Sequence, residues 1–278
     1  MKAIKSIAKT ALTFIAASVL FVTPAKAQFE MKFTSVESDS LDFVNESSKY
    51  HPGGWNFDII GMNIKTKKSS SSVFTPHIVL LGGWGFGFTN ALNAPSGMDV
   101  NMGRSFNFCI EDVFAIRMHP WKTGTLSLGA GIDVRNYRMT GSQRFLEDIT
   151  TKQISITDYP AGAIPNYSKI RTTDATFNLK YIQNLGRGFR LAFGPELSVI
   201  GHRGGQHKIV TQYEDATGEQ KEKFKNIKTN KVGVNLVGVL NYKNLVGIYA
   251  KYSPSNVLNP AFGPEFQSLS VGMMFFGL

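Results

Sequence analysis

The stretch Thr125–Tyr137, with the sequence TLSLGAGIDVRNY, alternates apolar residues with polar residues or glycines. Successive side chains of a β-strand point to opposite faces, so this stretch predicts a strand with one apolar and one polar face. In a soluble sheet the apolar face would cover a core and the polar face would meet water. In a membrane barrel the apolar face would meet lipid and the polar face would line the lumen. The rest of the chain favours the membrane.

The first residues indicate an exported protein. Lysines precede an apolar run over residues 11–22, and small residues precede a predicted cleavage site before Gln28. This order is typical of a secretory signal peptide over 1–27, and the run is short for an uncleaved bilayer anchor. No apolar stretch of about 18 residues follows, and an exported chain of this kind can cross an outer membrane as a closed barrel. We therefore expect a protein of the cell outer membrane.

Eight segments, including the opening stretch, show the same alternation. We predict strands within 76–88, 105–118, 125–137, 175–181, 191–199, 232–242, 246–252 and 268–278. The connections are short at 119–124, 183–188 and 242–245 and longer at 89–103, 138–170, 201–229 and 253–264. Short periplasmic turns and long extracellular loops are typical of outer-membrane barrels. The expected fold is all-β, a transmembrane antiparallel up-and-down β-barrel of eight strands over 75–278.

The segment before the barrel is harder to interpret. Residues 28–74 are largely polar and end in a serine-rich linker, with strand-like pieces at Phe29–Ser35 and Gly54–Ile64. Three interpretations stay open for this segment: a periplasmic extension, a plug, or two further strands that would make a ten-stranded wall.

Aromatic residues fall near both ends of the predicted strands, as in the two girdles that flank the apolar band of a membrane barrel. The girdle near the short turns is predicted to contain Trp121, Tyr181, Phe189 and Tyr242. The girdle near the long loops is predicted to contain Trp84, Phe88 and Phe106.

Charged residues collect on the inward parity of the strands. The predicted lumenal set is Glu111, Arg117, Asp133, Arg135, Asp174, Lys180, Arg190, Glu196 and Lys231. Counted along the strands, these residues predict a basic layer near the short turns and an acidic layer above it. An eight-stranded barrel is just wide enough for side chains to fill, and buried charges are tolerated when paired. We expect a salt-bridge network that closes the lumen; the alternative is an acidic layer that binds a cation or conducts ions.

Two residues of the second strand stand out. Asp112 has outward parity, which is wrong for lipid, and a β-bulge near Glu111 and Asp112 would restore the register. Cys109 is the only cysteine, so it forms no intramolecular disulfide, and we expect a small buried or lumenal side chain.

Several motifs resemble the small outer-membrane β-barrel proteins of Bacteroidota, including PorT-type members. They are GRSFNF at 103–108, LGAGI at 128–132 with NYR at 136–138, and YAKYSP at 249–254 leading to GPE at 263–265. The last strand is similar to the signal that barrel-assembly machinery recognises, although the chain ends on Leu278 rather than on an aromatic residue. The resemblance spans roughly 54–278 and implies a membrane barrel without implying an activity.

The long loops are the predicted sites of recognition, because binding sites concentrate on loops held by rigid scaffolds. The loop over 201–230 is rich in lysine around a predicted hairpin turn at 215–218. We expect it to extend the barrel above the membrane and, with the loop over 141–169, to contact a surface ligand or an envelope protein. Mobile solvated hairpins are the alternative.

Composition and loop residues also bear on chemistry and partners. The net charge of +10 includes four lysines of the predicted signal peptide, so the mature chain is nearer +6. This charge predicts contact of basic loops with outer-membrane lipid and lipopolysaccharide rather than with nucleic acid. A lipid-modifying enzyme is the third class, but the loop histidines His202 and His207 lack a carboxylate at a useful spacing and are interpreted as exposed. We predict no catalytic residue, no metal site and no cofactor.

Overall fold

The computed structural model describes residues 56–59, 62–65, 77–118, 124–200 and 207–276, which are mostly β-structure. The expected signal peptide, the segment 28–55 and Trp121 lie outside the described residues. Among the described residues, no helix is long and apolar enough to cross a membrane.

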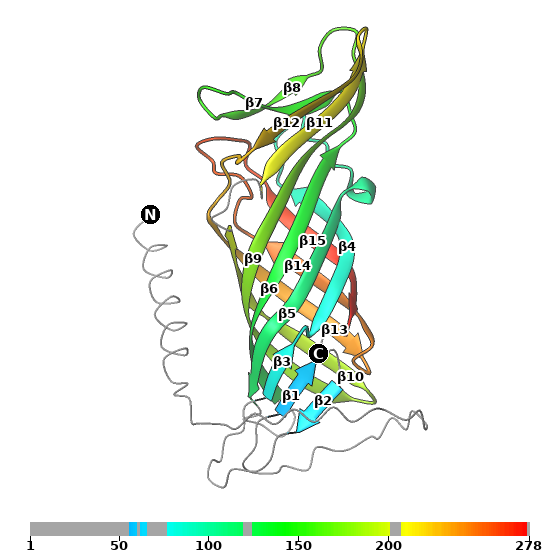
Figure 1. Cartoon of the computed structure of the whole chain (residues 1–278), viewed down its shortest axis with the longest axis vertical. Coiled ribbons are helices and arrows are strands. Elements are labelled where there is room, and N and C mark those ends of the chain that lie inside the picture. Colours follow the sequence, from blue (N-terminus) through cyan, green and yellow to red (C-terminus); the bar gives the residue numbers. More distant parts are fainter. Residues whose placement is uncertain (1–55, 60–61, 66–76, 119–123, 201–206, 277–278) are drawn as a thin grey trace. The chain divides into compact units, whose positions relative to one another are not determined.

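Eight strands close into an antiparallel barrel (Figure 1). They are β4 (Gly83–Leu92), β5 (Phe106–Met118), β6 (Gly124–Met139), β9 (Ile164–Gly186), β10 (Phe189–Ile200), β13 (Val232–Tyr242), β14 (Val246–Ser253) and β15 (Gln267–Phe275). Each pairs with the next in this order, and β15 pairs with β4 to close the ring. The predicted eight-stranded barrel is confirmed.

The seam between β15 and β4 depends on glycine. Gly272 lies directly opposite Gly87, and a Cβ atom on either residue would overlap the backbone of the opposite strand. The glycines that alternate with aromatic residues at the start of β4 therefore let the two closing strands approach each other, as expected for a crowded barrel wall.

The outer face of the barrel is apolar. Phe86, Phe193, Leu236 and Ile248 are among its most exposed side chains, at 48, 51, 54 and 62%. Their neighbours along each strand point inward and are buried or partly buried. This apolar band around a closed barrel is the surface that a membrane-spanning barrel presents to lipid.

The predicted bulge lies where expected. The ladder between β5 and β6 shifts register between Ile110 and Phe114, and Asp112 adopts a left-handed backbone conformation with φ 51°. The extra residue turns Asp112 inward, so its side chain is fully buried rather than facing lipid.

Three short strands extend the sheet at the short-turn end. They are β1 (Asn56–Ile59), β2 (Met62–Lys65) and β3 (His77–Leu80). β3 pairs with the lower half of β5, β1 pairs with β3 in parallel, and β2 pairs with β1. Because β15 and β4 already close the ring, β1 and β2 do not make a ten-stranded wall.

The long-loop end carries further strands, visible at the far end of the barrel from β1 to β3 in Figure 1. β6 continues to Met139 and β9 begins at Ile164, so both extend well above the apolar band. β9 pairs with β11 (Lys208–Asp215), which forms a hairpin with β12 (Gly218–Lys225); β7 (Gln143–Glu147) and β8 (Ile154–Asp158) form a separate two-stranded sheet.

These strands, the upper ends of β6 and β9, and the connections 93–105, 148–153, 226–231 and 254–266 are called the cap below. The connections predicted over 138–170 and 201–229 therefore contain strands for much of their length. The hairpin turn predicted at 215–218 is present.

Candidate functional site

The lumen contains a buried charge network centred on Lys251 of β14. The Lys251 Nζ atom lies 2.6 Å from a carboxylate oxygen of Glu111 and 3.1 Å from one of Glu196. A carboxylate oxygen of Asp133 lies 3.9 Å away. The three acids come from β5, β10 and β6, so one ammonium group joins widely separated parts of the wall. Lys251 is therefore a cation at the centre of the region where the sequence predicts an acidic layer.

A second ammonium group joins the same network to the bulge. Lys180 of β9 lies 2.9 Å from Asp112 and 3.3 Å from Glu111. Arg117 lies 3.3 Å from the other carboxylate oxygen of Asp112, and Asn178 donates a hydrogen bond to Asp112 at 3.1 Å. The bulge therefore places a carboxylate between two cations.

Arg135 completes the network on the long-loop side. Its guanidinium lies 2.6 Å from Asp133 and donates a hydrogen bond of 2.6 Å to the hydroxyl of Ser253. The joined set contains four carboxylates and four cations, all buried. Buried charges are tolerated when they are paired, and this set balances to zero.

The layers beside the network are also filled. A buried apolar cluster contains Cys109, Ile182, Ala192, Val237, Val239, Tyr249 and Met274. Ile182 follows Lys180 on β9 and Ala192 precedes Glu196 on β10, so this cluster lies mostly on the short-turn side of the charges. On the other side, a cavity of about 40 Å³ borders Arg135, Ser198 and Asn235. A space of this size holds a few water molecules.

A histidine that immediately precedes β11 borders this cavity. His207 is buried; its Nε2 atom lies 2.8 Å from Asp174 and its Nδ1 atom 2.6 Å from the hydroxyl of Thr229. The prediction of an exposed His207 is wrong, because the strand pairing of β11 with β9 brings the histidine against a carboxylate distant in sequence. A Thr–His–Asp row has the groups of a hydrolase triad, but the adjoining cavity is far smaller than a substrate pocket.

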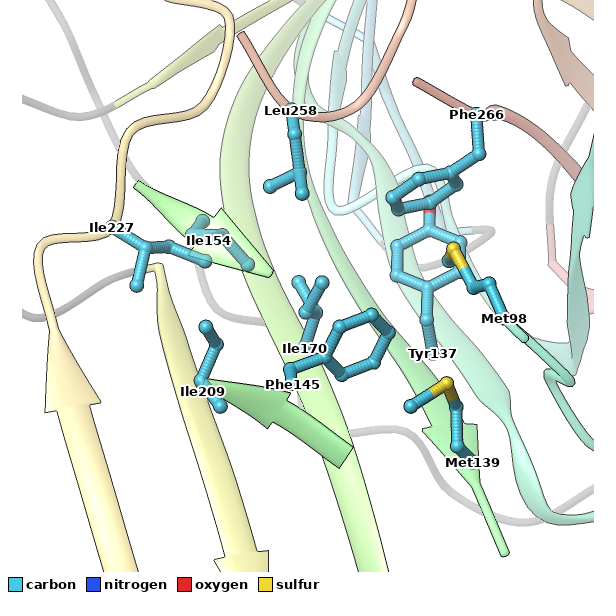
Figure 2. Close-up of a cluster of buried hydrophobic side chains, with 10 residues drawn as sticks. All are labelled: Met98, Tyr137, Met139, Phe145, Ile154, Ile170, Ile209, Ile227, Leu258 and Phe266. Atoms are coloured by element: carbon cyan, nitrogen blue, oxygen red, sulfur yellow. The ribbon is translucent and has the colours of Figure 1, made fainter. Parts of the chain in front are cut away.

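The cap has an apolar core of its own, shown in Figure 2. Its buried members are Met98, Tyr137, Met139, Phe145, Ile154, Ile170, Ile209, Ile227, Leu258 and Phe266. They come from β6 to β9, from β11, and from three connections, so the long loops fold against each other. Phe266 meets the Tyr137 ring edge-on at 5.2 Å between centroids, and the Tyr137 hydroxyl donates to Ser268 at 2.8 Å.

The cap also carries an open groove. It has a volume of about 500 Å³ and lies between β8 and the connections 93–105 and 254–266. Its lining includes Pro95, Ile156, Pro264 and Glu265. The volume falls within the range of small-molecule and peptide sites, about 300–1,000 Å³.

The predicted lumenal residues divide into two groups. The structure brings together Glu111, Arg117, Asp133, Arg135, Lys180 and Glu196. Asp174 lies apart at the cavity beside His207, Arg190 is half-buried at the start of β10, and Lys231 is exposed just before β13. Lys231 lies outside the strand, where the parity argument does not apply. The predicted basic and acidic layers are not separate, because Lys251 and Lys180 lie among the carboxylates.

Sequence reasoning missed two members of the network. Lys251 lies between the outward residues Ala250 and Tyr252, so its inward parity was available in the sequence. Parity marks Asp112 as misplaced for a lipid-facing residue and predicts the bulge, but it does not indicate that the carboxylate joins the lumenal network.

The predicted girdle residues that the structure describes lie on the outer face. Phe189 packs on Tyr242 with ring centroids 4.8 Å apart, at the short-turn end. Tyr181 packs against Phe193 nearby, and Phe106 begins β5 at the long-loop end. Phe88 lies midway along β4, and Trp84 stacks on Phe275 at 4.5 Å, near the short-turn end of both strands. Trp84 is not near the long loops as predicted, because β4 continues to Leu92 whereas the predicted strand ends at residue 88.

No protein-family model and no curated protein matches the chain. Among solved structures, a mutant of the Rh. blastica porin is similar at 10% identity, with a TM-score of 0.18, over 72% of this chain and 99% of that chain. A structure described as "Asymmetric conductivity of engineered proteins" is similar at 9% identity with the same TM-score and the same coverage. Likeness at this TM-score supports no argument about function, and the resemblance to small Bacteroidota barrels stays a prediction.

Proposed function

We propose that this protein is an outer-membrane barrel with a closed, non-conducting lumen, which anchors an ordered extracellular cap for recognition of a surface ligand or an envelope partner. Its role is structural and recognitive rather than catalytic. The balanced charge network around Lys251 is the observation that carries the closed lumen.

Closure is supported at three levels. Four carboxylates and four cations fill the middle of the lumen, and the apolar cluster that includes Ile182 and Met274 lies beside them. The cap core covers the long-loop end. An ion crossing this path would have to separate paired charges in a medium of low dielectric constant, which is strongly unfavourable.

Recognition by the cap is supported by its order. The long connections form strands around a buried core instead of solvated loops, which holds the groove beside β8 in a fixed shape. Among the described residues, the backbone groups of β8 on the side away from β7 have no pairing partner, apart from the bond from Ile154 N–H to the carbonyl of Phe262. An extended segment of a partner could pair there.

Single-channel recording in a planar bilayer tests the closed lumen. The refolded wild-type chain should insert without steady conductance. The triple variant Glu111→Ala, Asp174→Ala, Glu196→Ala removes charges from the network and from the cavity beside it. If any of these proteins conducts ions, it should be this variant. The variant Glu219→Ala, exposed on the cap, is the matched control and should be silent. Steady ion-selective conductance by the wild type would overturn the proposal in favour of a narrow channel.

A further inference from the structure

One face of the cap sheet is crowded with cations. Arg138, Lys169, Arg171, Lys208, Lys221, Lys223 and Lys225 are called the basic face. Residues directly opposite each other in an antiparallel ladder share a face. Arg138 lies opposite Lys169, Arg171 opposite Lys208, and Lys208 opposite Lys225. The basic face therefore contains three cross-strand pairs of like charge, an arrangement that destabilises a sheet.

These cations lack protein counter-charges. Among the described residues, no ion pair involves any member of the basic face. The ladder places Glu214 and Glu219 opposite each other near the tip of the β11–β12 hairpin, beyond most of the cations. Burial, followed by repulsion from neighbouring cations such as Arg138 and Arg171, lowers the pKa of Lys169. The face is therefore arranged for an anion that comes from outside the chain.

The position of the basic face indicates where that anion comes from. Along β9, the residues with the same outward parity as Arg171 continue through Thr173 to Ala175, Phe177 and Leu179. The last two are among the exposed apolar side chains of the barrel wall. The cations thus begin where the lipid-facing band ends, at the level of lipid headgroups.

An aromatic ring holds two of the cations in place. The Arg138 guanidinium lies 4.3 Å from the centroid of the Tyr167 ring, and Lys169 Nζ lies 5.0 Å from it. Tyrosine is enriched at membrane–water interfaces. The Nε atom of Arg138 is buried and has no hydrogen-bond partner among the described residues. This buried Nε is not accessible from outside, so the terminal nitrogens of the guanidinium are the donors that would bond a lipid phosphate.

We propose that the basic face binds the phosphate groups of outer-leaflet lipid headgroups, and so fixes the height and orientation of the cap on the membrane surface. The ligand class is a phosphorylated glycolipid or phospholipid whose acyl chains lie against the apolar wall of β6 and β9. This inference rests on the proposed outer-membrane location and not on closure of the lumen.

The test uses lipid A as the probe, added to the full chain in detergent micelles, with bound lipid counted by native mass spectrometry. Wild type should retain lipid A, and the double variant Lys169→Gln, Arg171→Gln should lose affinity by about tenfold or more, since each cation near an anionic surface contributes about fivefold. The matched control Lys152→Gln, Lys228→Gln removes the same charge from exposed cap positions away from the face, and it should bind like wild type.

Further arms separate the sources of phosphate. Dephosphorylated lipid A should not bind, and inorganic phosphate should not compete at millimolar concentration. Equal retention by wild type and the Lys169/Arg171 variant, or equal losses in both double variants, would overturn the proposal. So would tight binding of inorganic phosphate alone, which would indicate a site for a soluble anion. If the Lys169/Arg171 variant does not fold, the edge-strand variant Lys221→Gln, Lys223→Gln replaces it and should also bind more weakly. This test uses no conductance recording, so a negative result here would be distinguishable from evidence that the lumen is open.

Discussion

The lumenal network contains four cations and the basic face seven, and the surroundings of the two groups are opposite in kind. In the lumen, Arg117, Arg135, Lys180 and Lys251 are each paired with a buried carboxylate. On the basic face, Lys208 lies between Arg171 and Lys225 with no acid opposite it. The lumenal cations have their counter-charges within the chain, whereas the cations of the basic face are left to bind an anion from outside the chain.

This difference distinguishes structure from recognition. A buried cation must find its counter-charge inside the protein, because desolvation is otherwise too unfavourable. A cation on the surface keeps at least part of its solvation, so it can stay without a counter-charge at a smaller energetic cost until a ligand binds. Charges that serve the fold are therefore expected in pairs, and charges that serve binding are expected in groups of one sign.

The largest effect should come from breaking the lumenal pairing. Lys251→Met leaves Glu111, Glu196 and Asp133 facing each other without their central cation. Removing one partner of a buried pair costs about 3–5 kcal/mol. We expect the urea midpoint of the refolded chain in micelles, followed by tryptophan fluorescence, to fall sharply. Adding Glu196→Gln to this variant should recover part of the loss.

The exposed Lys228→Met is the matched control for Lys251 and should unfold at the wild-type midpoint. If Lys251→Met were as stable as wild type, the network would not hold the barrel together, and its charges would be available for conduction.

A smaller, local effect should follow from opening the cap core. Phe145→Ala removes a fully buried ring from the cluster of Figure 2 and should destabilise the cap by about 3 kcal/mol. The barrel below should stay folded, because the buried apolar cluster that contains Phe145 is made of cap residues. We expect faster trypsin cleavage within the β7–β8 hairpin and unchanged barrel migration on unheated gels. Phe193→Ala, on the lipid-facing wall, should leave cleavage unchanged.

The sequence predicts the barrel more fully than the cap. Alternation of apolar and polar residues continues only where one face meets lipid, so the eight wall strands and the bulge at Asp112 could be predicted from parity. Above the membrane both faces of β9 contain polar residues. Tyr167, Lys169 and Arg171 alternate with Ser168 and Ile170, a pattern that resembles a loop. The sequence therefore predicts connections where the structure has the cap strands.

The alternation of residues along a single strand cannot predict which charged side chains pair in the lumen. Parity indicates that Glu111 and Glu196 point inward, but it does not indicate that they meet the same ammonium group. That meeting depends on the register across β5, β6, β10 and β14, which the closure of the whole barrel sets. His207 shows the same limit, because Asp174 becomes its neighbour only through the pairing of β11 with β9.

The smallest effect should be a gain. Lys208→Gln removes a cation that lies opposite both Arg171 and Lys225, so it should stabilise the β11–β12 hairpin by about 0.5 kcal/mol without lipid. Slower hydrogen exchange of the β11 amides would measure this gain, with Lys228→Gln as the control. Burial, followed by the cations Arg171, Lys223 and Lys225, lowers the pKa of Lys208 from its ordinary value of 10.5.

A lysine whose pKa is lowered by folding destabilises the fold while it is charged, and this penalty disappears as the pH rises through the lowered pKa toward 10.5. The gain from Lys208→Gln should therefore be full near neutral pH and shrink in the alkaline range. Bound lipid A should reverse its sign, because the phosphate would then stabilise wild type more than the variant. If neither alkaline pH nor lipid A changed the stability gained by Lys208→Gln, repulsion between the cations of the basic face would not limit the stability of the hairpin. The contrast between this face and the paired charges of the lumen would then lose its energetic basis.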